Sequence, residues 1–187
     1  MKKTYSSFIA IIGRPNVGKS SLINKILGQK IAIVSDKPQT TRTRIMGVLT
    51  REENQFVFID TPGFHKPRNT LGEQMMKAVG NGLTDVDAAI LVVEAAPNFK
   101  FDKDNLPAAE IELISELKRR KLRAVLVINK IDLLSDKEEL FEIITAYNNV
   151  FDFDATIPVS AISGDGIDIV VAEAEKYLKE SPHYFAS

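Results

Sequence analysis

Short apolar runs and amphipathic segments alternate along the chain. Continuous apolar runs bounded by polar or turn-forming residues predict buried strands, whereas apolar residues recurring about every three to four positions predict helices with one buried face. The predicted strands cover residues 8–12, 45–51, 55–60, 88–94, 123–129 and 156–159. The predicted helices cover residues 19–27, 71–82, 108–121, 137–148 and 167–179.

The alternation of these elements predicts an α/β fold. Strands that alternate with helices favour a mostly parallel sheet, here of about six strands, covered by helices on both faces. The strands at 45–51 and 55–60 are separated only by Glu52, Glu53 and Asn54, a connection of hairpin length. One strand is therefore expected to run antiparallel to the others.

Two longer polar segments, residues 29–44 and 61–69, fit neither pattern. Both contain proline, and both flank the glycine-framed stretch between the first strand and the first helix. Long polar loops in a compact domain are usually functional. These two segments are therefore expected to contribute to a site near that stretch.

Composition limits the classes of protein that need consideration. The chain has 187 residues, of which 44% are hydrophobic and 26% charged, values typical of one soluble globular domain. The net charge is -1, so no global field attracts nucleic acid or anionic lipid. The chain has no cysteine, which fits a reducing compartment, and we expect a cytoplasmic protein.

No segment predicts export or membrane insertion. The first apolar run ends at Gly13, shorter than the ~7–15 residues that a signal peptide needs. The longest other apolar run, residues 88–93, is far below the ~18 residues of a membrane-spanning helix.

Residues 13–20 read GRPNVGKS and lie between a predicted strand and a predicted helix. This is the pattern and the context of a phosphate-binding loop, in which backbone N–H groups, a helix N-terminus and a lysine face the phosphates. The Ser20 hydroxyl is then a candidate Mg²⁺ ligand. The candidate phosphate-binding residues are Gly13, Asn16, Val17, Gly18, Lys19, Ser20 and Ser21. The alternative is a glycine turn before a helix that happens to carry Lys-Ser.

Residues 60–63 read DTPG and follow an apolar strand. An acid at this position is expected to reach Mg²⁺, usually through water, and the Gly63 N–H is expected to face the terminal phosphate. Asp60 and Gly63 are therefore candidate binding residues. The alternative is an ordinary turn.

Residues 129–132 read NKID and follow another buried strand, so their side chains emerge where open α/β sheets bind ligands. An ionised Asp132 can accept hydrogen bonds from guanine N1–H and its exocyclic amine, which adenine does not offer. Asn129 can contact the base and tie this loop to the phosphate loop, and the Lys130 stem can cover the ring. Backbone N–H groups at Ser160 and Ala161 could reach guanine O6. A helix-capping turn is the alternative in both places.

The motifs GRPNVGKS, TTR, DTPG, NKID and SAISG, in this order, resemble the translation-factor-related GTPases. The stretches KPQTTRTR and DTPGFHKPRNTLG are similar to the Era-like family of ribosome-assembly GTPases, and the resemblance extends from about residue 9 to residue 184. It implies a three-layer P-loop NTPase fold of the Ras-like G-domain type. It also implies an enzyme that hydrolyses GTP to GDP, with Mg²⁺ as cofactor.

The resemblance also implies roles for individual residues. Thr41, with Thr40 as the alternative, corresponds to a magnesium ligand in the family, completing a metal set with Ser20 and Asp60. The implied catalytic residues are Lys19, Thr41, Gly63 and Asn16.

A cation hypothesis follows from two of these positions. Phe64 stands where signalling GTPases carry a glutamine that orients water, and a phenyl ring cannot do this. In related GTPases the position of Asn16 helps to bind K⁺ beside the phosphates. The alternative is that Asn16 only forms hydrogen bonds within the loop.

Family members act as switches in assembly of the small ribosomal subunit, and carry a C-terminal KH domain that binds 16S rRNA. Residues 1–180 are expected to form the GTPase domain, and residues 181–187 a tail or the start of a linker. No part of the chain resembles the KH domain, so RNA and 30S binding are implied only for a full-length parent. The resemblance also allows peripheral association with the inner membrane.

Two alternative functions stay open. A nucleotide-controlled binding module with negligible turnover is favoured by Phe64. A P-loop kinase would share GRPNVGKS, but the NKID sequence argues against it.

Overall fold

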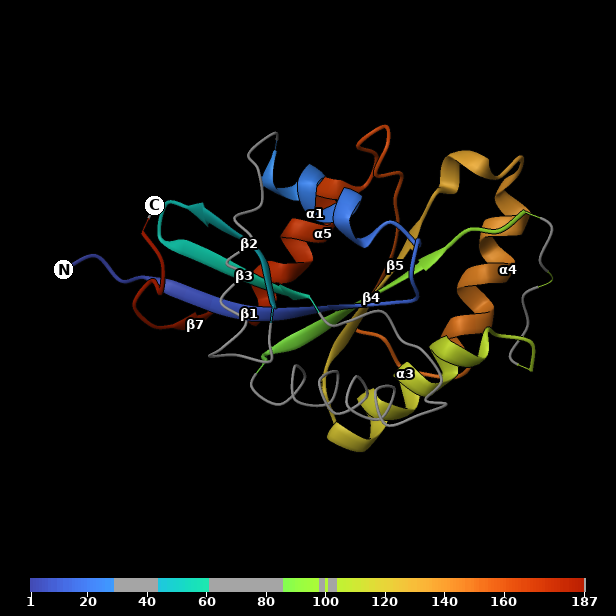
Figure 1. Cartoon of the computed structure of the whole chain (residues 1–187), viewed down its shortest axis with the longest axis horizontal. Coiled ribbons are helices and arrows are strands. Elements are labelled where there is room, and N and C mark those ends of the chain that lie inside the picture. The colour runs from blue at the N-terminus through green and yellow to red at the C-terminus, as the bar shows by residue number, and fades with distance from the viewer. Residues whose placement is uncertain (29–43, 61–85, 98–99, 101–103, 187) are drawn as a thin grey trace.

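A mostly parallel β-sheet lies between two layers of helices in the computed structural model of the chain (Figure 1). The structure describes residues 1–28, 44–60, 86–97, 100 and 104–186. The predicted helix at 71–82 lies outside these residues.

The described elements match most of the predicted ones. The strands are β1 (Tyr5–Ile12), β2 (Arg44–Arg51), β3 (Asn54–Asp60), β4 (Ala88–Glu94), β5 (Ala124–Asn129), β6 (Ala155–Pro158) and β7 (Lys179–Glu180). The helices are α1 (Lys19–Leu27), α3 (Ala108–Arg120), α4 (Lys137–Asn148) and α5 (Ile167–Ala174), with short 3-10 turns at Ile131–Leu133 and Glu175–Tyr177.

The strand order is β2-β3-β1-β4-β5-β6. Strands β3, β1, β4, β5 and β6 run parallel to their neighbours, and β2 pairs with β3 in the antiparallel direction, as the hairpin-length connection predicted. The carboxyl ends of β1, β3, β4, β5 and β6 therefore all lie at the same edge of the sheet. This carboxyl edge is where open α/β sheets bind ligands.

Both faces of the sheet are buried. Alternate residues of β1 point to opposite faces, so Ile9 and Ile11 pack in one apolar cluster while Ala10 and Ile12 pack in the other. The first cluster contains α1 and α5, and the second contains α3 and α4. This explains why the central strands are continuous apolar runs rather than alternating patterns.

The C-terminal part of the chain differs from the prediction. The helix expected over 167–179 ends at Ala174, continues as a 3-10 turn, and is followed by β7. Strand β7 pairs antiparallel with Tyr5 and Ser6 of β1, whereas β4 pairs only with the later residues from Ile9 onward. The early half of β1 thus offers hydrogen-bonding groups that β7 satisfies, which gives the sheet a second antiparallel member.

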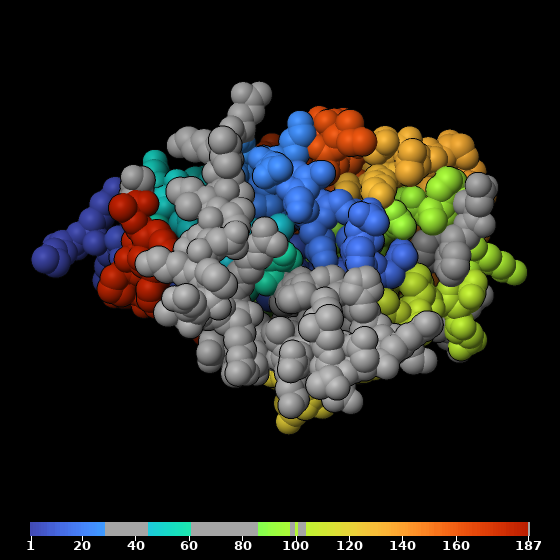
Figure 2. All heavy atoms as spheres, in the orientation of Figure 1, coloured from blue at the N-terminus to red at the C-terminus, as the bar shows by residue number. Residues whose placement is uncertain are grey.

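The residues after β7 pack against the sheet. The backbone of Tyr184 and Phe185 contacts the buried side chain of Gln55, and the Tyr184 ring packs edge-on against Phe8 at 4.9 Å. Figure 2 shows these C-terminal residues, in red, at the same end of the molecule as the N-terminal residues, in dark blue. Within the described part of the chain, no helix is long and apolar enough to cross a membrane.

Candidate functional site

The GRPNVGKS stretch forms the loop between β1 and α1. Gly18 adopts a left-handed conformation (φ 100°) and its carbonyl accepts the first hydrogen bond of the helix, from the Leu22 N–H at 2.9 Å. The Lys19 ammonium turns back and donates to the Gly13 carbonyl at 2.8 Å. Lysine and helix N-terminus therefore meet in one loop, which is the arrangement expected of a phosphate site.

Lys19 and Asp60 are electrostatically coupled. Partial burial lowers the pKa of Lys19 below its ordinary value, and the Asp60 carboxylate acts in the opposite direction by favouring the charged form. Asp60 ends β3 and pairs in register with Ile11 of β1, which explains how the two motifs come together. The carboxylate predicted to bind a cation thus influences the lysine predicted to bind phosphate.

Asn129 joins three loops. Its side chain is 2% exposed; Nδ2 donates to the Val17 carbonyl at 3.0 Å, and Oδ1 accepts from the Ala161 N–H at 3.0 Å. The phosphate loop, the NKID loop and the SAISG loop are thereby fixed relative to one another. The predicted tie between Asn129 and the phosphate loop is present.

Gly18 permits this close approach. A Cβ atom at residue 18 would overlap with Nδ2 of Asn129, and the left-handed φ of Gly18 is unfavourable for any other residue. Glycine is needed here on both counts.

Asp132 lies at the exposed rim of the same site. The Ser160 hydroxyl donates to its Oδ1 at 2.8 Å and itself accepts from the Ser163 N–H at 3.3 Å. The carboxylate is therefore oriented by a neighbouring loop while it faces solvent, as a group that accepts hydrogen bonds from a ligand should be.

The backbone N–H groups of Ser160 and Ala161 have partners within the protein. The Ser160 N–H donates to the Asp165 carbonyl at 3.0 Å, and the Ala161 N–H donates to Asn129. Both N–H groups that the sequence offered to guanine O6 are thus engaged within the protein. In this structure the Ser160 hydroxyl orients Asp132, and the Ala161 N–H orients Asn129.

The structure describes only some of the other predicted site residues. Ser20 and Ser21 lie exposed in the first turn of α1, and Asn16 lies exposed in the loop with a left-handed φ of 67°. Thr41 and Gly63 lie outside the described residues, as does Phe64, so part of the predicted metal and catalytic sets stays a prediction.

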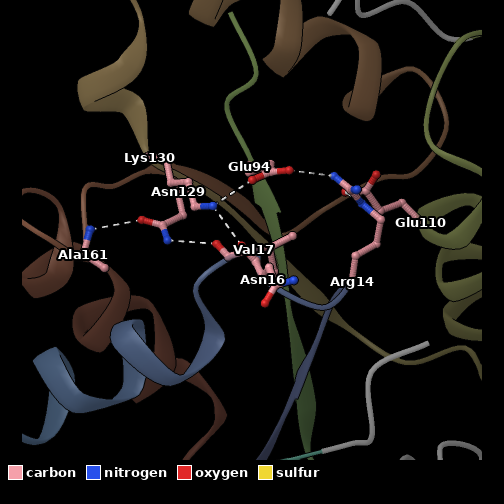
Figure 3. Close-up of polar contacts among 8 residues, drawn as sticks. All are labelled: Arg14, Asn16, Val17, Glu94, Glu110, Asn129, Lys130 and Ala161. Atoms are coloured by element: carbon pink, nitrogen blue, oxygen red, sulfur yellow. Dashed lines mark hydrogen bonds and ion pairs between the residues drawn. The ribbon is translucent and has the colours of Figure 1, made fainter. Parts of the chain in front are cut away.

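A charged cluster that the sequence did not predict lies behind the phosphate loop (Figure 3). Glu94 at the end of β4 accepts from Lys130 Nζ at 2.8 Å and pairs with Arg14 Nη2 at 3.3 Å. Arg14 also pairs through Nε with Glu110 of α3 at 3.4 Å. The signal in the sequence was an acid directly after the apolar strand at 88–93, the same pattern that singled out Asp60.

Glu110 is fully buried. Burial raises the pKa of its carboxyl group to about 7, and the opposing effects of the Arg14 guanidinium and the Tyr147 hydroxyl do not cancel it. Burial raises the pKa of the Tyr147 hydroxyl, and the nearby Glu110 carboxyl group raises it further. The cluster therefore contains a carboxyl group that titrates near neutral pH.

Comparison with known proteins gives the class to which this fold and site belong. A family model described as 50S ribosome-binding GTPase matches residues 8–130. The chain belongs to this family of GTPases, whose fold is the P-loop GTPase fold found here.

Within the family, the chain is similar to proteins named GTPase Era. The relative from Ruminiclostridium cellulolyticum is 46% identical over 182 residues, which is 97% of this chain and 58% of the relative. The chain thus spans 58% of the length of that relative.

Two crystal structures of Era have the same fold. Era in complex with MgGDPNP and a segment of 16S ribosomal RNA matches with a TM-score of 0.79 and 30% identity, over 98% of this chain and 60% of that chain. A variant of Aquifex aeolicus Era bound to GDP and AlF4- matches with a TM-score of 0.79 and 31% identity, over 98% and 60%.

Proposed function

We propose that the chain binds GTP with Mg²⁺ and hydrolyses it to GDP and phosphate, and that it thereby acts as a switch in assembly of the small ribosomal subunit. The observation that carries the proposal is Asn129, which joins the phosphate loop to the loop that carries Asp132. A nucleotide has its phosphates and its base at opposite ends, and this side chain connects the two candidate sites.

Base selection rests on Asp132. Its carboxylate is oriented by Ser160 and faces solvent, so it can accept from guanine N1–H and the exocyclic amine together. A site built around such acceptors rejects a base that lacks the donors by ~10⁴–10⁵, because the acceptors are then left unpaired.

Phosphate binding rests on Lys19, Ser20 and Asp60. The donor set of a lysine, a hydroxyl in the first helical turn and a nearby carboxylate fits a magnesium–phosphate group. The ion, when bound, neutralises charge on the phosphates. The loop N–H groups and Lys19 position the terminal phosphate for attack by water, and no covalent intermediate is needed.

The proposed role in assembly of the small ribosomal subunit is supported by the relatives. The related Era structure holds a segment of 16S ribosomal RNA, and the chain covers 60% of that protein. We assign rRNA and 30S contact to the longer protein, acting in the cytoplasm, with the nucleotide state of this domain controlling the contact.

The first experiment is GTP hydrolysis by the purified chain with Mg²⁺, in KCl and in NaCl, for the wild type and Asn16→Ala. Stimulation by K⁺ that Asn16→Ala removes would support a cation-assisted GTPase with Asn16 in its site. No turnover in either salt despite tight GTP binding would overturn the proposed GTPase activity. The chain would then be a nucleotide-controlled binding module.

A second experiment tests base selection through Asp132→Asn. The amide would offer a donor where guanine needs an acceptor, so we expect the Kd for GDP to rise at least ~10²-fold and xanthosine diphosphate to be preferred instead. Asp136→Asn is the matched control, because Asp136 caps α4 and asparagine caps equally well. Unchanged preference for guanine in Asp132→Asn would refute the assignment.

A further inference from the structure

Glu94 occupies a central position between the two loops of the site. It ends β4 and lies in register with Asn129, the last residue of β5. Its two carboxylate oxygens face different loops: Oε1 pairs with Arg14 of the phosphate loop at 3.3 Å, and Oε2 accepts from Lys130 of the NKID loop at 2.8 Å. Figure 3 shows Glu94 between these two side chains.

Lys130 depends on this contact for its placement. Its backbone is left-handed (φ 65°), a conformation that is unfavourable for lysine and needs support from the surroundings. Its ammonium group donates both to Glu94 and, at 2.8 Å, to the Asn16 carbonyl in the phosphate loop. The side-chain stem is thereby stretched from the base loop toward the phosphate loop.

Arg14 is held from a second side. Its Nε lies 3.4 Å from Oε1 of Glu110, which is fully buried in the first turn of α3. Glu94 and Glu110 together fix the guanidinium group, and with it the start of the phosphate loop, against the body of the domain.

We propose that Glu94 is a positioning residue for nucleotide binding: by holding Lys130 with one oxygen and Arg14 with the other, it sets the spacing between the base-binding and phosphate-binding loops. This inference rests on the proposed function, and it concerns a residue that acts through Arg14 and Lys130. It complements Asn129, which joins the same loops through neutral hydrogen bonds.

The charges explain why a carboxylate is required. The side chains of Glu94, Arg14 and Lys130 are 29%, 30% and 30% exposed, so the network is half-buried and is screened less than a surface pair. Without the negative charge, two cations remain behind one loop and repel each other. Glu94→Gln keeps the size of the side chain and removes only this charge.

The test is equilibrium binding of fluorescent GDP and GTP analogues to the purified chain with Mg²⁺. We expect Glu94→Gln to raise the Kd about ten-fold for both nucleotides alike, with kcat at saturating GTP changed less than about two-fold, because ground-state and transition-state binding are lost together. Glu116→Gln is the matched control, since Glu116 lies on the same helix as Glu110 and its ion-pair partners, Arg119 and Arg120, lie on that helix too.

A double-mutant cycle shows whether Glu94 acts through Lys130. In a Lys130→Met background, we expect Glu94→Gln to raise the Kd less than about three-fold, since the contact is already lost. Full additivity, or a Kd within two-fold of the wild type in the single variant, would overturn the inference. So would a lower fraction of active protein with an unchanged Kd, which indicates only impaired folding. Absence of GDP and GTP binding by the wild type would instead refute the proposed function.

Discussion

Two polar side chains, Gln55 and Glu110, are equally buried at opposite ends of the sheet. They differ in how well their surroundings satisfy their polar atoms. Both are 0% exposed. Gln55 lies near the start of β3, at the amino edge, and Glu110 lies in the first turn of α3, beside the loops of the carboxyl edge.

Gln55 is neutral, and both polar atoms of its side chain form hydrogen bonds. Its Nε2 donates to Thr50 Oγ1 and to the Phe185 carbonyl, both at 2.9 Å, and its Oε1 accepts from the N–H groups of Tyr184 and Phe185 at 2.8 and 3.2 Å. A buried amide satisfied in this way stabilises a single arrangement of the chain.

Glu110 is an ionisable group in buried surroundings that favour its neutral form. Burial outweighs the attraction of Arg14, so its pKa is raised to about 7. The comparison teaches that the buried ionisable group beside the candidate site has an electrostatic cost, whereas the buried amide at the opposite edge is satisfied and structural. Four predictions test this division.

The largest effect is expected at the carboxyl edge, from Gly18→Ala. The new Cβ would displace Asn129 and force alanine into a left-handed conformation. We expect the Kd for GDP to rise about 10³-fold, equal to about 4 kcal/mol. Gly164→Ala is the control, because Gly164 is also left-handed (φ +89°) but has nothing within 4 Å of the added atom. Equal losses of affinity in both variants would show that backbone strain alone is responsible.

The second effect concerns the pH dependence of stability. Because the folded-state pKa of Glu110 is about 7 and the ordinary value is 4.5, the folded protein holds more protons than the unfolded chain between these values. The contribution of Glu110 to the free energy of unfolding is therefore present below pH 4.5 and lost as the pH rises to about 7, by about 3 kcal/mol.

Glu110→Gln removes this titration. Relative to the wild type, the variant should gain stability as the pH rises through that window, measured by urea unfolding followed by circular dichroism. The Arg14, Tyr147 and Glu94 groups face the carboxyl group and stay in place in this variant. A variant that instead loses stability with rising pH would show that the ionised Glu110–Arg14 pair dominates over burial.

The third effect is at the amino edge, from Gln55→Leu. The leucine keeps the volume but leaves the backbone groups of Tyr184 and Phe185 without their partners, so the C-terminal residues should detach. We expect a loss of about 2 kcal/mol in the free energy of unfolding and no change in the Kd for GDP. A higher Kd would mean that the two edges of the sheet are coupled and that Gln55 is not purely structural.

The smallest effect is expected from Tyr184→Ala. The Tyr184 ring packs on Phe8 in an edge-on geometry but is 57% exposed. Its removal should lower the free energy of unfolding by about 1 kcal/mol. Tyr184→Phe should restore most of this loss, because the ring contact is kept; failure to restore it would assign the effect to the hydroxyl group.

The sequence by itself determined most of the described elements and the main motifs. Helices α1 and α4 and strand β4 begin and end at the predicted residues, since glycine, proline and polar residues bound apolar periodic segments there. The placement of Asn129 against the phosphate loop was also predictable, because both motifs follow parallel strands and parallel strands end at one edge.

Only the tertiary structure decided the contacts between distant segments. Strand β7 exists because the early half of β1 pairs with β3 on one side but not with β4 on the other, a property that no local pattern around Lys179 contains. Glu94, Arg14 and Glu110 meet although they belong to three separate segments, and burial makes the charge of Glu110 costly. Local periodicity follows from neighbouring residues, whereas partner choice and burial depend on how the whole chain packs.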